Sequence, residues 1–193
     1  MTLEDEIEIV QLMREARLKS RGYASFFGWS IDREQEELGA AKALAESLEL
    51  DGKLFFHDLK IRGSGNDPPD LEALSVSGER IAFELTELVD GAAIQAYKDG
   101  KVHDWATWDR KKFIDLVSSL LANKATRFSK LKGSPYPGGY VIVIFTDEPS
   151  LTTQAVENYL KGHIFCNAPD ISGSYLVLSY DPALGRCPYF NLT

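Results

Sequence analysis

Apolar and polar residues alternate most regularly over residues 80–88, in the segment RIAFELTEL. A period of two is typical of a β-strand and predicts that Phe83 and Leu85 lie on one face while Ala82 and Glu84 lie on the other. Because the first face is apolar, the face of Glu84 is expected to be open to solvent or to line a cleft.

The residues before this strand predict an antiparallel hairpin. A short strand over 70–76 leads into a turn at Gly78, and the proline pair that ends at Pro69 disfavours a helix just before it. Residue 77, beside this turn, is midway between Asp70 and Glu84, so the two acids lie within a few residues of being opposite each other. The two carboxylates are therefore expected to face one another across the hairpin.

Helical and strand-like periodicities alternate along the rest of the chain. The run YVIVIFT is apolar throughout, as expected of a central strand that is buried on both faces. The predicted elements are helices over 3–19, 33–48, 109–131 and 150–161, and further strands over 53–63, 140–146, 174–180 and 188–192. This order predicts an α/β fold with a mixed sheet flanked by helices. We expect one domain, with a helical extension over 1–32 and a core over 33–193 that carries an insertion at 91–108.

Composition narrows the class of protein. The chain has 193 residues, of which 44% are hydrophobic and 26% charged, as is ordinary for one globular domain. No run is long and apolar enough to cross a membrane, and the acidic start MTLEDEIEIV does not resemble a signal peptide. Two cysteines are too few for a disulfide framework. A cytoplasmic protein without a membrane partner is expected.

Charge is segregated along the chain. The formal net charge of −8 argues against a protein that coats nucleic acid non-specifically, because phosphate binding needs basic side chains. Residues 110–132 are the exception, with only Asp115 among seven basic residues: Arg110, Lys111, Lys112, Lys124, Arg127, Lys130 and Lys132. A local basic strip remains compatible with an enzyme that acts on nucleic acid.

The two hairpin acids indicate a candidate cation site. Facing carboxylates such as Asp70 and Glu84 repel each other unless a cation lies between them, and Mg²⁺ is commonly held by one or two carboxylates together with water and phosphate oxygens. Such an ion lowers the pKa of bound water and offsets negative charge in phosphodiester hydrolysis.

These residues carry a resemblance to a known family. Asp70 at the start of one strand, followed by Glu84, Leu85 and Thr86 on the next, resembles the motif of the PD-(D/E)XK superfamily, the restriction-endonuclease-like nucleases. The resemblance covers roughly residues 33–146 and implies a restriction-endonuclease-like core. It also implies that the two carboxylates and the Leu85 carbonyl bind Mg²⁺ or Mn²⁺.

The third motif position departs from the family, because Thr86 stands where a lysine is usual. Threonine carries no positive charge and cannot activate a water molecule in the same way. Some members of the superfamily have moved the basic residue to another element, and Lys124 in the long predicted helix is the preferred replacement here. The alternatives are Lys111, Lys112 and Arg80.

A further acid is implied by the resemblance. In the superfamily a glutamate on the first core helix often points at the metal site. Glu37 matches that position best in this chain, and Glu36 is the next candidate.

The resemblance implies a metal-dependent nuclease that hydrolyses phosphodiester bonds in nucleic acid, DNA in preference to RNA. The alternative is a catalytically inactive protein of the same fold that binds nucleic acid or protein. A homodimer is a further option that rests on the resemblance alone, because such nucleases often pair to cut two strands.

Overall fold

A computed structural model describes residues 23–24, 33–63, 65–101, 105–166 and 168–193. The helix predicted over 3–19, and all of the predicted extension 1–32 except Tyr23 and Ala24, lies outside the described residues.

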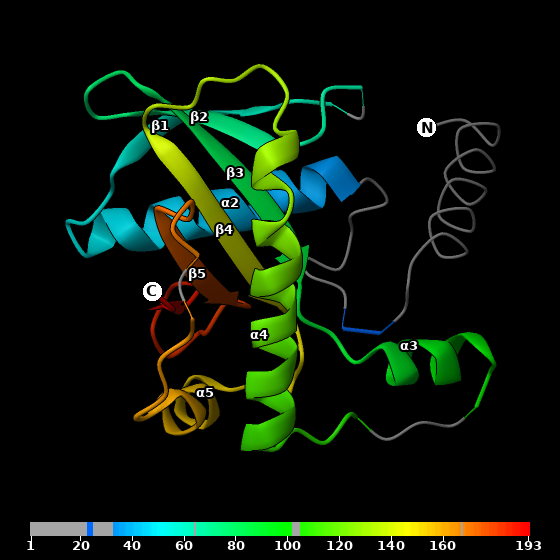
Figure 1. Cartoon of the computed structure of the whole chain (residues 1–193). Coiled ribbons are helices and arrows are strands. Elements are labelled where there is room, and N and C mark those ends of the chain that lie inside the picture. Colours follow the sequence, from blue (N-terminus) through cyan, green and yellow to red (C-terminus); the bar gives the residue numbers. More distant parts are fainter. Residues whose placement is uncertain (1–22, 25–32, 64, 102–104, 167) are drawn as a thin grey trace, which may run out of the picture.

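Six strands form one mixed sheet, in the same order as along the chain (Figure 1). Their bounds are β1 Phe56–Ile61, β2 Leu71–Ser75, β3 Arg80–Glu87, β4 Gly139–Thr146, β5 Gly173–Leu178 and β6 Tyr189–Asn191. The pairs β1–β2, β2–β3 and β5–β6 are antiparallel, whereas β3–β4 and β4–β5 are parallel. The predicted mixed sheet, with a meander of three strands followed by a central apolar strand, is confirmed.

The described helices are α2 Arg33–Leu50, α3 Gly91–Lys98, α4 Arg110–Ala125 and α5 Thr153–Leu160. Asp109 caps the start of α4 by accepting a hydrogen bond from the backbone N–H of Lys112. The helix predicted over 109–131 ends earlier than expected, at Ala125. The chain then tightens into the short 3₁₀ helix η1, Phe128–Lys130, as is common at the ends of α-helices.

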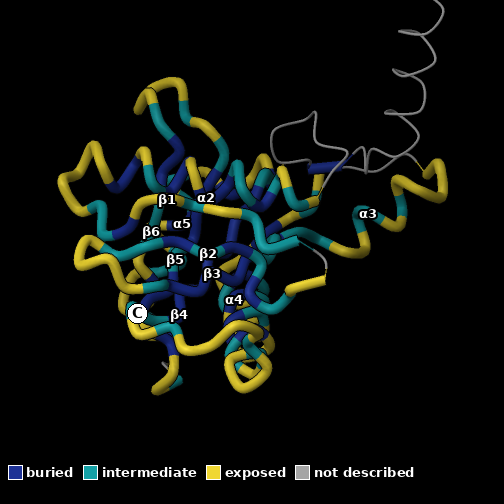
Figure 2. Tube along the Cα trace, turned by 90° about the horizontal axis from the view of Figure 1, so that it is seen from above, coloured by how far each residue is buried: buried dark blue, intermediate teal, exposed yellow. Residues whose placement is uncertain are grey.

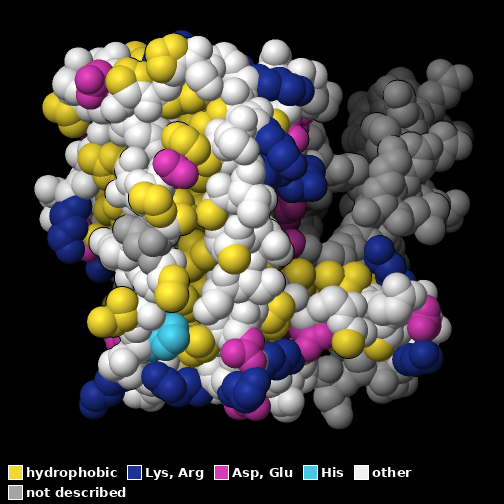
Figure 3. Space-filling model, in the orientation of Figure 1, with side chains coloured by type: hydrophobic (Ala, Val, Ile, Leu, Met, Phe, Trp, Pro, Cys, Tyr) yellow, Lys and Arg dark blue, Asp and Glu magenta, His cyan; other side chains and the backbone are white. Residues whose placement is uncertain are grey.

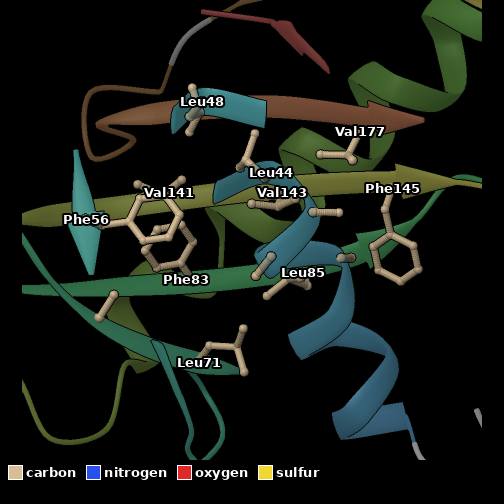
Figure 4. Close-up of a cluster of buried hydrophobic side chains, with 14 of the residues drawn as sticks. Leu44, Leu48, Phe56, Leu71, Phe83, Leu85, Val141, Val143, Phe145 and Val177 are labelled. Carbon is tan, nitrogen blue, oxygen red and sulfur yellow. The ribbon is translucent and has the colours of Figure 1, made fainter. Parts of the chain in front are cut away.

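The helices cover both faces of the sheet. Helix α2 packs on one face, where Leu44 and Leu48 meet Phe83, Leu85 and neighbouring strand residues (Figure 4). Helices α4 and α5 cover the other face and contribute Phe113, Val117, Leu121 and Val156 to a second apolar cluster. The result is three layers, with the most deeply buried strands between the helices (Figure 2).

Strand alternation assigns each residue of β4 to one of these layers. Val141 and Val143 belong to the cluster under α2, while Tyr140, Ile142 and Ile144 belong to the cluster under α4. This two-sided burial explains why the strand is apolar throughout.

Glu84 corrects one expectation from the sequence. It pairs in register with Ile142 on the face that α4 covers, and its side chain has 0% exposure. The expectation that this face is solvent or the wall of a cleft was wrong, because strand alternation identifies opposite faces but not which of them a later helix covers.

None of the helices in the described ranges is both long and apolar enough to cross a membrane. Cys166 is exposed, Cys187 is buried, and both are free thiols.

Candidate active site

Asp70 and Glu84 lie opposite each other at the open end of the hairpin. The antiparallel register pairs Leu71 with Phe83, so one further step along both strands brings Asp70 opposite Glu84. Asp70 Oδ2 accepts a hydrogen bond of 2.7 Å from the backbone N–H of Leu85. The loop acid is thereby tied to the strand that carries Glu84.

The Leu85 carbonyl lies on the same side of β3. In a strand the N–H and C=O groups of one residue point the same way, and the Leu85 N–H points towards Asp70. Strand β2 begins only at Leu71, so it does not pair with this part of β3. The implied ligand set of two carboxylates and one carbonyl is therefore compatible with the backbone.

Asp67 adds a third carboxylate. Oxygen atoms of Asp67, Asp70 and Glu84 all lie within 4.8 Å of one another, and within the described ranges no other group of three such side chains meets this criterion. Asp67 belongs to the loop between β1 and β2, whose Pro68 carbonyl accepts a hydrogen bond of 2.7 Å from the backbone N–H of Lys132. The segment after α4 thus contacts this loop.

Lys124 places its ammonium group between the two hairpin acids. Its Nζ donates to Asp70 Oδ2 at 3.0 Å and to Glu84 Oε2 at 2.6 Å. The reason lies in the helical period, since Val117 and Leu121 face the sheet and Lys124 continues the same stripe by one turn.

The alternative basic residues lie elsewhere. Lys111 pairs with Asp115, Lys112 pairs with Asp90, and Arg80 pairs with Glu72. Lys124 is thus the one of these four that contacts both hairpin acids.

Arg127 reaches the same acids from the turn that follows α4. Its Nε lies 3.2 Å from Glu84 Oε2, and its guanidinium pairs with Asp67 and lies 4.0 Å from Asp70 Oδ1. Lys and Arg side chains gather over this end of α4 on the molecular surface (Figure 3).

A pocket of about 210 Å³ opens beside the acids. Its lining comes from α2, from both ends of the β1–β2 loop and from Arg127, and consists of Arg33, Glu34, Glu37, Gly63, Asp67, Asp70 and Arg127. Glu37 is buried and accepts a hydrogen bond of 2.7 Å from Arg33 Nε. Glu36, the second candidate on this helix, does not line the pocket.

Burial and neighbouring charges shift the pKa values of the two hairpin acids in opposite directions. Burial, followed by repulsion from Asp70, raises the pKa of Glu84 to about 7. Burial also disfavours the charged form of Asp70, but Lys124 and the Leu85 N–H more than offset it, so the pKa of Asp70 lies below its usual value. Asp70 is thus charged over the neutral range, while Glu84 gains or loses its proton near pH 7.

The pKa of Glu37 is shifted in the same direction as that of Glu84. Burial, followed by repulsion from Asp70, raises the pKa of Glu37, and the hydrogen bond from Arg33 only partly opposes this.

The donor set fits a hard divalent cation. Mg²⁺ and Mn²⁺ prefer oxygen ligands, and three carboxylates converge here. Glu84 Oε1 is buried and has no hydrogen-bond partner among the described residues, which is costly for a carboxylate oxygen. A bound cation is the kind of partner that this oxygen lacks.

The structure adds residues that sequence reasoning did not assign to the site. Asp67 stands three residues before Asp70 in the NDPPD segment, and Arg127 stands three residues after Lys124, one helical turn further along. Arg33 stands four residues before Glu37, which is the spacing of an ion pair on a helix. Their spacing of three or four positions from a predicted site residue is the feature of the sequence that could have identified them.

No protein-family model matches the chain, and comparisons with curated proteins and with solved structures found no significant match.

Proposed function

We propose that this protein is a metal-dependent nuclease that hydrolyses phosphodiester bonds in nucleic acid, with Mg²⁺ or Mn²⁺ as its cofactor. The observation that carries the proposal is the convergence of Asp67, Asp70 and Glu84 within 4.8 Å, with Lys124 in contact with two of them. A lysine among acids at the edge of a polar pocket suits hydrolysis of a charged ester.

The order of elements supports the proposal. Apart from α3, which falls within the predicted insertion at 91–108, the order is a helix, three antiparallel strands, a second helix and a strand parallel to the third, as in the restriction-endonuclease-like core that the sequence resembles. Asp70 stands directly before β2 and Glu84 within β3, in keeping with the motif. The missing motif lysine at Thr86 is compensated in this proposal by Lys124 from α4.

Each group has a role in the proposed reaction. Asp67, Asp70, Glu84 and the Leu85 carbonyl would hold the cation, which supplies Lewis acidity and lowers the pKa of a bound water. Lys124 carries a positive charge at the carboxylates, where it can orient the attacking water or offset charge that develops on the phosphate.

One observation favours the alternative of an inactive binding protein. Lys124 Nζ already bridges Asp70 and Glu84, and a buried ammonium group can neutralise facing carboxylates without any metal. In that case the acids and Lys124 form a structural ion-pair network, and the neighbouring basic side chains bind nucleic acid or protein.

Cleavage assays with the purified full chain separate the two functions. Duplex DNA, single-stranded DNA and RNA are incubated with Mg²⁺, with Mn²⁺ or with chelator, and cation binding is followed by calorimetry. We expect cleavage only with cation, strongest on DNA. Glu84→Gln and Asp70→Asn should lose both cleavage and cation binding.

The control is Glu79→Gln, which removes an acid at the turn of the same hairpin, and it should leave both measurements unchanged. Absence of cleavage of every substrate with either cation would refute the nuclease and leave the binding protein, whether or not the chain binds a cation.

A further inference from the structure

The side chain of Arg127 contacts the three carboxylates that the proposed cation would use. We propose that Arg127 changes partners when cation and substrate bind: it would leave Asp67, Asp70 and Glu84 where these residues hold a divalent cation, and its guanidinium would then bind the substrate phosphate. This inference rests on the proposed function and adds a phosphate-binding residue to it.

Competition for the same oxygens is the first argument. Arg127 Nε lies 3.2 Å from Glu84 Oε2, its guanidinium pairs with Asp67, and Asp70 Oδ1 is 4.0 Å away. A cation held by these three residues would repel the nearby guanidinium of Arg127. It would also neutralise the carboxylate charge that now attracts Arg127.

Arg127 is better placed than Lys124 to move. The Lys124 side chain is 9% exposed, and its carbonyl accepts a hydrogen bond of 2.7 Å from the buried Tyr140 hydroxyl. The Arg127 side chain is 27% exposed, follows the end of α4 and lines the pocket. The bond to Tyr140 fixes the Lys124 backbone, and the buried ammonium is held by its own bonds to Asp70 and Glu84, while Arg127 can turn into the pocket.

Charge explains why the cation must come first. Acidic side chains at the pocket and beneath it outnumber the basic ones, the acids being Glu34, Glu37, Asp67, Asp70 and Glu84 and the bases Arg33, Lys124 and Arg127. Above the raised pKa values of Glu84 and Glu37 all of them are ionised, and the excess is then two negative charges, which disfavours a phosphate. A divalent cation would neutralise this excess, so that the positive charge of Arg127 is available to a phosphate.

The guanidinium suits the second partner. Arginine presents several N–H donors in a planar fork that matches two oxygens of a phosphate, and a phosphodiester in a nucleic acid offers such a pair. The substrate group recognised here is thus the backbone phosphate and not a base, so Arg127 should contribute affinity without sequence preference.

Calorimetry tests the first half of the exchange. Mg²⁺ and Ca²⁺ are titrated separately into the full chain and into Arg127→Gln, which removes the competing charge. We expect the variant to bind both ions about tenfold more tightly, the equivalent of about 1.4 kcal/mol. Arg127→Lys, which retains a positive charge, should stay closer to the wild type. Thermal melting of each variant verifies folding.

Binding of labelled DNA tests the second half. Affinity for a short fluorescein-labelled duplex and for its single strand is measured by anisotropy at several salt concentrations, in Ca²⁺ and in chelator. In Ca²⁺, Arg127→Gln should bind about tenfold more weakly and lower the salt slope by about one phosphate contact. In chelator it should match the wild type, because Arg127 is then held by the acids.

Lys130→Gln is the matched control, since it removes one exposed positive charge from η1, three residues further along the chain. Any loss of DNA affinity in this variant should be the same in Ca²⁺ and in chelator.

The exchange is overturned if Arg127→Gln binds cations no more tightly than the wild type, or if its loss of DNA affinity is equal with and without Ca²⁺. Both readouts are binding measurements. A protein that shows them but cleaves nothing refutes the proposed nuclease and leaves the exchange intact, while cleavage without them does the reverse.

Discussion

The Asp70 carboxylate accepts a hydrogen bond of 2.7 Å from the backbone N–H of Leu85, one residue beyond the Glu84 that it faces. The bond continues the connection between the two strands past the point where β2 begins. Together with the bond from Lys124, it fixes the direction of an acid that directly follows a loop.

Asp70→Ala should therefore destabilise the protein more than Asp70→Asn. The alanine leaves the Leu85 N–H without its acceptor and Lys124 with one fewer partner, at a cost of about 2–3 kcal/mol, whereas asparagine keeps an acceptor oxygen and should cost about 1 kcal/mol less. Urea unfolding at neutral pH measures the difference. Equal losses for both variants would mean that the bond to Leu85 contributes little.

Stability should fall as pH rises from 5 to 8. The pKa of Glu84 is about 7 in the folded protein, above the value of about 4.3 for an unperturbed glutamate, so the folded state binds more protons over this range. The stabilisation that this bound proton gives the folded state is complete below pH 4 and is lost as pH rises through 7. It amounts to roughly 1–3 kcal/mol in the free energy of unfolding. Glu37 acts in the same direction.

Urea unfolding at pH 5.5 and pH 8 without divalent cations checks this slope. Glu84→Gln, which is neutral at every pH, should remove most of it. Asp70 acts with the opposite sign, because its lowered pKa makes its contribution disappear only in more acidic solution. A wild-type protein that is equally stable at both pH values contradicts the prediction.

Cation affinity should rise with pH over the same range. A cation that binds the Glu84 carboxylate displaces its proton, so affinity should increase up to about tenfold per pH unit below 7 and level off above it. Calorimetry of Mg²⁺ binding at pH 6 and pH 8, in buffers of different ionisation enthalpy, measures both the affinity and the proton released. Affinity that does not change with pH would show that Glu84 is not a ligand.

Lys124→Met should destabilise the protein in a way that depends on pH. The variant leaves the buried Glu84 facing Asp70 without its closest cation, which costs about 3–5 kcal/mol when Glu84 is ionised. At pH 5.5 Glu84 is protonated and the cost should be smaller. Urea unfolding at pH 5.5 and pH 8 compares the two conditions.

Lys111→Met is the control for that comparison. Lys111 lies on the same helix with its side chain 85% exposed, so the change should stay within about 0.5 kcal/mol at both pH values. If both methionine variants behave alike, the contact between Lys124 and the acids does not contribute to stability.

Tyr140→Phe should weaken the candidate site indirectly, through the backbone of Lys124. The Tyr140 hydroxyl donates to the Lys124 carbonyl at 2.7 Å in a buried position, and its loss should cost about 1–2 kcal/mol and loosen the end of α4. In the proposed nuclease, kcat should fall several-fold with little change in KM, because Lys124 is displaced and the pocket is not.

Tyr159→Phe provides the comparison, since its hydroxyl bonds to the Trp108 carbonyl at 2.8 Å, just before the other end of α4. It should cost a similar amount of stability, measured by urea unfolding, and leave cleavage unchanged. Equal effects of the two variants on kcat would mean that the stability of the whole helix matters and the position of Lys124 does not.

Local pattern was enough for the hairpin. The alternation over 80–88 and the turn at Gly78 predict the strand and bring Asp70 within a few residues of being opposite Glu84, and the observed register of β2 and β3 makes the two positions opposite. Both features depend on residues close in sequence, where strand geometry leaves few choices. The same holds for the apolar run that became β4.

Only the tertiary structure decided what surrounds the two acids. The sequence could not show that α4 covers the face of Glu84, because the path of a helix across a sheet depends on how distant apolar residues pack. That packing brings Lys124 and Arg127 to acids that lie 40 or more residues earlier in the chain. The alternation and the turn in the sequence thus determined that the Asp70 and Glu84 carboxylates face each other. Long-range packing determined their burial, their charge and the basic residues beside them.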